Sequence, residues 1–186
     1  MTRNLAALCA LVFAGCSSGS AVEDGNSFNQ ADQKFVQEMI SHHEQAVVMS
    51  EMVSNVEVSG ETAALATEII GAQASEVELM KSFLSEWGVE FDPSSDPHDG
   101  HMMSGDESQG MMTDEGLAEL ENLMGSNFEK MWLTMMLAHH KGAIKMAETV
   151  IAEGKDARVK TLAEAIISEQ KKEIDLIDLL LAKLGS

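Results

Sequence analysis

The sequence carries an internal repeat with an offset of 97 residues, and this repeat limits the fold more than any other feature. The two His-His pairs of the chain, His42-His43 and His139-His140, come into register at that offset. The register continues without a gap through further positions, among them Met39, Ala46, Met49, Leu65, Ile69, Gln73, Glu76 and Leu84 in the first copy and Met136, Ala143, Met146, Leu162, Ile166, Gln170, Glu173 and Leu181 in the second. Such self-similarity predicts one supersecondary unit built twice.

Helix-capping residues recur in the same register. Asn29 and Ser126 are both N-cap residue types, and an acidic residue follows each of them three positions later. Ser126 and Glu129 have the sequence pattern of a capping box. The matching signals for a second helix in each copy are Ser59 and Asp156 as N-caps, and Gly88 and Gly185 as left-handed residues that end the helix. Apolar residues recur every three or four positions between these signals, so each copy is predicted to be a helical hairpin.

Two such hairpins pair most simply as a four-helix bundle, because neither can bury its apolar face alone. We therefore expect an all-α fold in which residues 29–88 form the first hairpin. Residues 114–186 contain a short helix, ending near residue 124, and the second hairpin. Residues 89–113 form a long connection rich in Gly, Ser, Asp and Pro, and a connection of this length is usually functional or disordered.

The first residues have the features of an export signal. Arg3 precedes an apolar run that is too short to cross a membrane as a helix, so residues 1–15 are predicted to be a signal peptide. The run ends in Val-Phe-Ala-Gly-Cys, which resembles a bacterial lipobox with Cys16 as the lipidated residue. Residues 16–28 would then be a flexible, lipid-anchored tether. The alternative is a plain secretory signal in which Cys16 has no role. Both interpretations predict export to the periplasmic or cell-surface side of a bacterial membrane.

Charge and cysteine content exclude several classes of protein. The chain has 12 Lys and Arg against 31 Asp and Glu, a formal net charge of -19, which repels the phosphates of nucleic acids. Its 2 cysteines, Cys9 and Cys16, both lie near the start of the chain. The sequence therefore argues against a nucleic-acid-binding protein, a cysteine zinc finger and a thiol enzyme.

Histidine and methionine gather in the same places. On a helix, Met39, His42, His43 and Met49 share one face with the small residue Ala46, within an arc of about 120°. The equivalent face of the second copy carries Met136, His139, His140 and Met146, and the connection adds His98, His101, Met102, Met103, Met111 and Met112. A single methionine on an apolar face is usually core filler. The repeated association with histidine makes all of these residues candidate metal ligands.

The ligand types favour copper. Thioethers select Cu(I), imidazole binds several transition metals, and Mg²⁺ or Ca²⁺ would require oxygen ligands. Zinc sites use Cys, His or carboxylate and would leave the methionines unexplained. A di-iron site of the ferritin type needs Glu-x-x-His, whereas Met39 stands three residues before His42 and Met136 three before His139. The sequence therefore predicts a copper site that prefers Cu(I) and also accepts Cu(II) through imidazole.

The doubled motif Met-x-x-His-His-x-x-Ala-x-x-Met, together with the later Gln73 and Gln170, resembles the bacterial family known as domain of unknown function 305. The resemblance covers roughly residues 28 to 185. It implies a ferritin-like helical bundle outside the cytoplasm that binds copper through Met and His and contributes to copper resistance. The ligands that it supports are Met39, His42, His43, Met49, Met136, His139, His140 and Met146.

Three functions are consistent with these features. The leading hypothesis is an exported, lipid-anchored protein that sequesters, buffers or transfers copper without catalysis. Its expected partners are the copper ion, the membrane through the lipid, and a copper-transfer protein. The first alternative is a structural or interaction lipoprotein whose His-His pairs are satisfied core groups. The second is a metal-dependent oxidase, for which the sequence offers no evident carboxylate ligand set.

Overall fold

The described part of the chain is built of helices, as the sequence predicts. The computed structural model describes residues 27–92 and 109–185. In chain order its elements are α1 (Gln30–Met52), the 3-10 helix η1 (Val53–Asn55), α2 (Gly60–Trp87), α3 (Asp114–Glu121), α4 (Gly125–Glu153) and α5 (Ala157–Leu184). The predicted signal peptide, Cys16 and the connection residues His98, His101, Met102 and Met103 lie outside the described residues.

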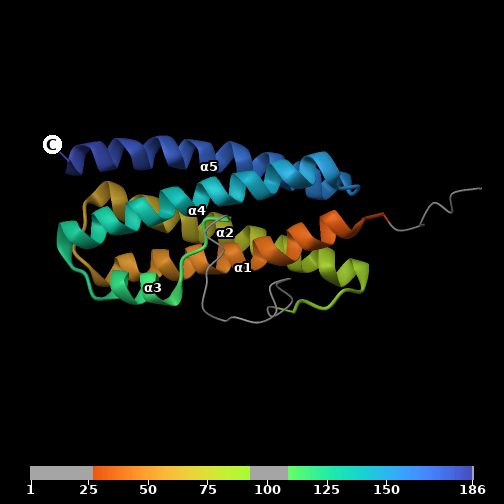
Figure 1. The fold of residues 1–186 in the computed structure, drawn as a ribbon, viewed down its shortest axis with the longest axis horizontal. Coiled ribbons are helices and arrows are strands. Elements are labelled where there is room, and N and C mark those ends of the chain that lie inside the picture. Colours follow the sequence, from red (N-terminus) through yellow and green to blue (C-terminus); the bar gives the residue numbers. More distant parts are fainter. Residues whose placement is uncertain (1–26, 93–108, 186) are drawn as a thin grey trace, which may run out of the picture.

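The four long helices form a bundle of two hairpins. α1 packs along α2, α4 packs along α5, and the hairpins meet chiefly through α1 and α4. Figure 1 shows α1 and α4 running through the middle of the molecule, with α5 along one edge and the short α3 near one end. The predicted all-α bundle is confirmed.

The second helix of each hairpin keeps the repeat register. α2 and α5 each contain 28 residues, and their ends differ by the repeat offset. The side chain of Ser59 accepts a hydrogen bond from the backbone N–H of Thr62, and that of Asp156 accepts one from Arg158, so both predicted N-caps are present. Gly88 ends α2 with a φ of 68°, the left-handed conformation that favours glycine.

The predicted capping box at the start of α4 is wrong. α4 begins at Gly125 after Met124, which makes no side-chain capping bond, and Ser126 lies inside the helix. Glu129, the expected partner of Ser126, directs its carboxylate to Ser59 in the other hairpin instead. The corresponding box at Asn29, by contrast, is complete.

Two other helix ends also differ from the prediction. α3 ends at Glu121 rather than near residue 124, because the N–H of Leu123 turns back to the carbonyl of Leu120 at 3.1 Å. Gly185 has a φ of -93° and is not left-handed. Its N–H bonds to the carbonyl of Leu181 and continues the helical pattern, so no reversal of the chain requires a positive φ there.

Buried apolar side chains form two clusters, each with residues from all four long helices. The first core cluster contains Phe35, Val36, Met39, Ile40, Val77, Met80, Phe83, Leu84, Ala143, Met146, Ala147, Val150, Val159, Leu162, Ala163 and Ile166. The second core cluster contains Ala46, Met49, Val53, Leu65, Ala66, Ile69, Leu120, Phe128, Trp132, Leu133, Met135, Met136, Ile177 and Leu180. On each long helix, a short stretch that contains polar residues lies between the residues of the first core cluster and those of the second.

Two buried acidic side chains join the hairpins at opposite ends of the bundle. Asp32 of α1 accepts hydrogen bonds from two backbone N–H groups at the start of α5, at 2.8 and 3.1 Å. Its repeat equivalent, Glu129 of α4, accepts bonds at the start of α2 from the hydroxyls of Ser59 and Thr62, at 2.5 and 2.6 Å. A helix N-terminus favours negative charge, so each acid stabilises the first turn of a helix in the other hairpin. We call these two contacts the end clasps.

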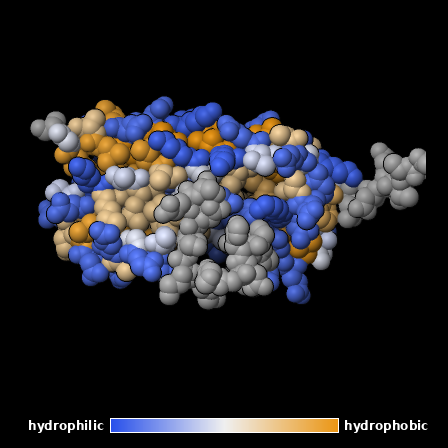
Figure 2. Space-filling model, in the orientation of Figure 1, coloured by the Kyte–Doolittle hydropathy of each residue, from blue (hydrophilic) through white to orange (hydrophobic). Residues whose placement is uncertain are grey.

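The surface is mixed in polarity. Figure 2 shows hydrophilic side chains spread over the visible face, with apolar areas between them. Within residues 27–92 and 109–185, no helix combines the length and apolar character that a membrane span requires.

The end clasps generate a stability prediction. Asp32→Ala removes the carboxylate that accepts two N–H groups at the start of α5, of which that of Asp156 is buried, and we expect it to lower the free energy of unfolding by about 2 kcal/mol or more. Asp178→Ala is the matched control, because Asp178 is exposed on α5, and its effect should stay within about 0.5 kcal/mol. Urea denaturation followed by circular dichroism measures both. Equal stabilities of the two variants would contradict the proposed role of Asp32.

Candidate metal centre

A layer of polar side chains crosses the bundle between the two core clusters. Each long helix supplies two of them, and we call the set the polar layer: His42, His43, Gln73, Glu76, His139, His140, Gln170 and Glu173. The histidines are 0–1% exposed and the two glutamines 2–3% exposed. The repeat by itself does not show where in the fold the two His-His pairs lie. In the structure they meet between α1 and α4, in the interior of the bundle.

His42 and His139 form the contact between the two copies. Their ring centroids are 3.7 Å apart, with an angle of 37° between the planes. Burial, together with the neighbouring His43, lowers the pKa of His42 from 6.5 to about 3. Burial also holds the pKa of His139 well below its usual value, and the adjacent His42 acts in the same direction. Both rings are therefore neutral near pH 7, and neutral imidazole is the form that binds metal ions.

The second histidine of each pair turns toward the other helix of its own hairpin. His43 Nε2 lies 2.8 Å from Glu76 Oε2, and His140 Nε2 lies 2.7 Å from Glu173 Oε2. A carboxylate only accepts hydrogen bonds, so Nε2 carries the proton in both contacts. Carboxylates commonly hold metal-binding histidines in this way. All four histidine rings are buried.

Several nitrogen atoms of the polar layer have no hydrogen-bond partner within residues 27–92 and 109–185. These are Nδ1 of His42, His43 and His140 and both ring nitrogens of His139; the side-chain amides of Gln73 and Gln170 are also unpaired. A buried polar atom without a partner costs about 1–3 kcal/mol. A metal ion that accepts imidazole nitrogen would offset this cost. The donor set of the layer therefore fits a transition-metal ion.

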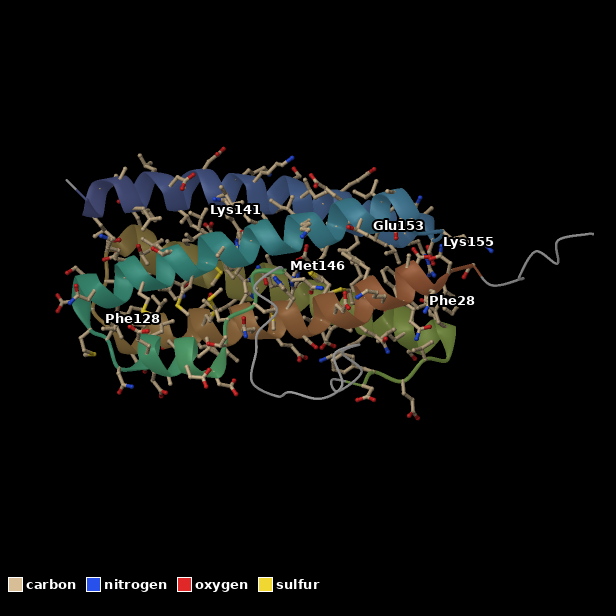
Figure 3. The ribbon with its side chains drawn as sticks, viewed as in Figure 1. Phe28, Phe128, Lys141, Met146, Glu153 and Lys155 are labelled. Carbon is tan, nitrogen blue, oxygen red and sulfur yellow. The ribbon has the colours of Figure 1, made fainter. Side chains whose placement is uncertain are left out.

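The four predicted methionine ligands of the helices lie on both sides of the polar layer. Met39 and Met146 belong to the first core cluster, and Met49 and Met136 belong to the second. Met146 is 9% exposed and the other three are fully buried. Figure 3 shows sulfur atoms in the space between α1 and α4, where Met146 is labelled. Because α1 and α4 are antiparallel, each side of the layer receives one methionine from each copy of the motif.

The end of the connection, residues 109–112, lies beside the polar layer. Met111 and Met112 are half-buried, and Met112 packs against the second core cluster. The backbone carbonyl of Gln109 lies 3.0 Å from Nε2 of His42. The connection thus contacts the polar layer directly through the Gln109 carbonyl, and the ligand role of Met111 and Met112 stays a prediction.

Sequence reasoning did not identify the glutamine and glutamate residues of the polar layer as parts of the site. A signal for them was nevertheless present. Gln73 occupies an interior position in the apolar stripe of α2, between Ile69 and Val77, and Gln170 repeats it in α5. A polar residue that recurs at a buried helical position in both copies indicates a function other than packing.

Imidazole and carboxylate alone do not complete a site. Among residues 27–92 and 109–185, no group of three or more His, Cys, Asp or Glu side chains is arranged to hold a metal ion. A centre in the polar layer therefore depends on thioether or amide groups beside the histidines. Thioethers are soft ligands, which narrows the choice of ion toward copper.

The lowered histidine pKa values predict acid sensitivity of the metal-free protein. Because His42 has a pKa near 6.5 when unfolded and about 3 when folded, its neutral burial stabilises the fold fully above pH 6.5. That contribution falls as the pH decreases from 6.5 toward 3, by up to about 1.4 kcal/mol per pH unit for each such histidine. Urea denaturation between about pH 7 and pH 5 should show this slope, because carboxylates titrate mainly below this range. The double variant His42→Leu/His139→Leu should show a smaller slope; an unchanged slope would contradict the assignment.

Comparison with known proteins identifies the family to which this chain belongs. The model of DUF305, a domain of unknown function, matches residues 32–181. A DUF305 protein from Streptomyces coelicolor is 34% identical, with a TM-score of 0.74 over 84% of this chain and 94% of that chain. A DUF305 fragment from Deinococcus radiodurans is 26% identical, with a TM-score of 0.73 over 83% and 97% of the two chains. CopM in its Cu(II)-bound form is 26% identical, with a TM-score of 0.68 over 82% and 96%. No curated protein matches the sequence. Since the family match spans most of the chain, this protein belongs to the DUF305 family.

Proposed function

We propose that this protein binds copper at the polar layer and sequesters, buffers or transfers the ion without catalysis. The observation that carries the proposal is the buried, neutral pair of His42 and His139, whose free ring nitrogens lie between methionine-containing clusters. Its structural relative CopM, at 26% identity, has been solved in a Cu(II)-bound form, which supports copper as the ion.

Ligand chemistry favours Cu(I) over Cu(II) in this interior. Thioethers carry no charge and bind soft ions, and neutral imidazole binds both oxidation states. A monovalent ion also carries less charge into a buried site than a divalent ion does, and burial of charge is costly. The proposed ligands within the bundle are Met39, His42, His43, Met49, Met136, His139, His140 and Met146. His98, His101, Met102, Met103, Met111 and Met112 are proposed to take up copper in the connection.

An anaerobic titration with Cu(I) against a coloured chelator tests the proposal. The protein without residues 1–16 should compete with the chelator. Changing His42, His43, His139 and His140 to Ala should weaken binding by about tenfold or more, since each tenfold corresponds to about 1.4 kcal/mol of lost ligation. Met124→Leu is the control, because Met124 is 67% exposed and lies outside the polar layer, and it should bind like the wild type.

The other outcomes of this titration are equally informative. Unchanged affinity in the histidine variant would contradict a site in the polar layer and leave the connection methionines as the ligands. Failure of the wild type to compete, with the circular dichroism spectrum of a folded helical protein, would favour the structural lipoprotein alternative.

We further propose that the mature protein is anchored through lipid on Cys16 at the periplasmic or cell-surface side of the membrane. The lipobox-like sequence that ends at Cys16 supports this proposal. In bacteria that express the full chain, the wild type should label with radioactive palmitate and sediment with membranes. Cys16→Ser should abolish both properties. A labelled or membrane-bound Cys16→Ser protein would contradict the anchor, and a soluble exported wild type would favour a plain secretory signal.

A further inference from the structure

The end of the connection is docked across both central helices. The Gln109 carbonyl lies over α1 at His42, with 3.0 Å between its oxygen and Nε2. Three residues further on, the side chain of Gln45 holds Met112 through two hydrogen bonds. Gln45 Nε2 donates to the Met112 carbonyl at 2.9 Å, and the Met112 N–H donates to Gln45 Oε1 at 2.8 Å. We call residues 109–112 the strap.

Two glycines allow the strap to lie this close to α4. A Cβ atom on Gly142 would stand 1.5 Å from the carbonyl oxygen of Gln109, a distance that no pair of unbonded atoms permits. A Cβ on Gly110 would stand 2.3 Å from the carbonyl oxygen of Ala138, and Gly110 also has a φ of 78°. The contact between the strap and α4 therefore depends on the absence of a side chain at both positions.

The strap breaks the symmetry of the repeat. At the offset of 97 residues, Gly142 of α4 corresponds to Gln45 of α1. In the second copy the strap packs against the backbone of Gly142, and in the first copy the side-chain amide of Gln45 binds the strap through hydrogen bonds. The two facing histidines differ accordingly. Nε2 of His42 contacts the Gln109 carbonyl, whereas neither ring nitrogen of His139 bonds to the described residues of the connection.

This contact determines which nitrogen of His42 is free. A backbone carbonyl can only accept a hydrogen bond, so Nε2 must carry the proton. A neutral imidazole has one N–H, and its other nitrogen, Nδ1, then carries a lone pair. That Nδ1 is buried and has no hydrogen-bond partner among the residues that the structure describes.

We propose that the strap positions the copper centre by locking His42 in the Nε2–H tautomer, which makes Nδ1 the atom that binds the ion. The inference rests on the proposed copper function. Gln109 acts as the positioning residue, and Gln45 and Gly142 hold it in place. Among the described residues of the strap, none makes such a contact with His139.

Gly142→Ala tests the strap, with Gly71→Ala as its matched control. Both glycines lie inside long helices, and both changes raise helix propensity equally, but a Cβ on Gly71 would have no described atom of another element within 4 Å. Nitrogen NMR of the metal-free, ¹⁵N-histidine-labelled protein reports the tautomer of His42. The wild type and Gly71→Ala should show the Nε2–H form, and Gly142→Ala should show a mixture of tautomers. Copper affinity in Gly142→Ala should fall by about tenfold, as is typical when an outer partner of a ligand is lost.

Gln45→Leu provides a second variant if Gly142→Ala does not fold. It removes both hydrogen bonds to Met112 while keeping a side chain of similar size, and it should shift the His42 tautomer in the same direction. An unchanged His42 spectrum in the folded variants, or copper binding as tight as in the wild type, overturns the strap proposal alone. Absence of copper binding by the wild type overturns the proposed function instead, and the positioning of the ion with it.

Discussion

The contact between His42 and His139 is the point on which the arrangement of this protein depends. Two imidazole rings lie 3.7 Å apart at the interface of α1 and α4, and this is also where the two hairpins meet. The contact is compatible with the fold only while both rings are neutral, because two buried positive charges at that distance would repel each other strongly. Neutrality stabilises the fold and at the same time leaves nitrogen lone pairs available to an ion.

The unpaired polar atoms of the polar layer lower the free energy of unfolding, and the packing of the rest of the bundle offsets this loss. Its unpaired nitrogen and amide atoms are buried between two apolar clusters, each built from all four long helices. The end clasps of Asp32 and Glu129 reinforce the structure far from the layer, where each acid crosses from one hairpin to a helix start in the other. Strong contacts at both ends of the bundle thus accompany incomplete hydrogen bonding at its centre. This distribution is typical of a site that is formed in advance and completed by its ligand.

A duplicated motif does not produce two identical half-sites. The chain has one strap for two copies of the motif; the strap bonds to His42, and its described residues make no hydrogen bond to His139. The positions that hold the strap, Gln45 and Gly142, are repeat equivalents with opposite roles. The two central histidines therefore differ in their contacts although the sequence motif around them is repeated.

Sequence patterns by themselves determined the helical hairpins and their register. The spacing of apolar residues and the caps at Ser59, Asp156 and Gly88 act through contacts within a few residues, so they can be recognised without knowledge of the fold. The same holds for the buried face that carries the methionines and histidines. Where local signals compete with distant partners, as for Glu129 at the start of α4, the sequence pattern predicted the wrong contact. Only the tertiary structure decided that the His-His pairs meet inside the bundle and that the strap bonds to His42. It also decided that Glu76 contacts His43 and Glu173 contacts His140. These contacts join residues more than thirty positions apart, and their formation depends on how the helices pack in three dimensions rather than on any local preference of the chain.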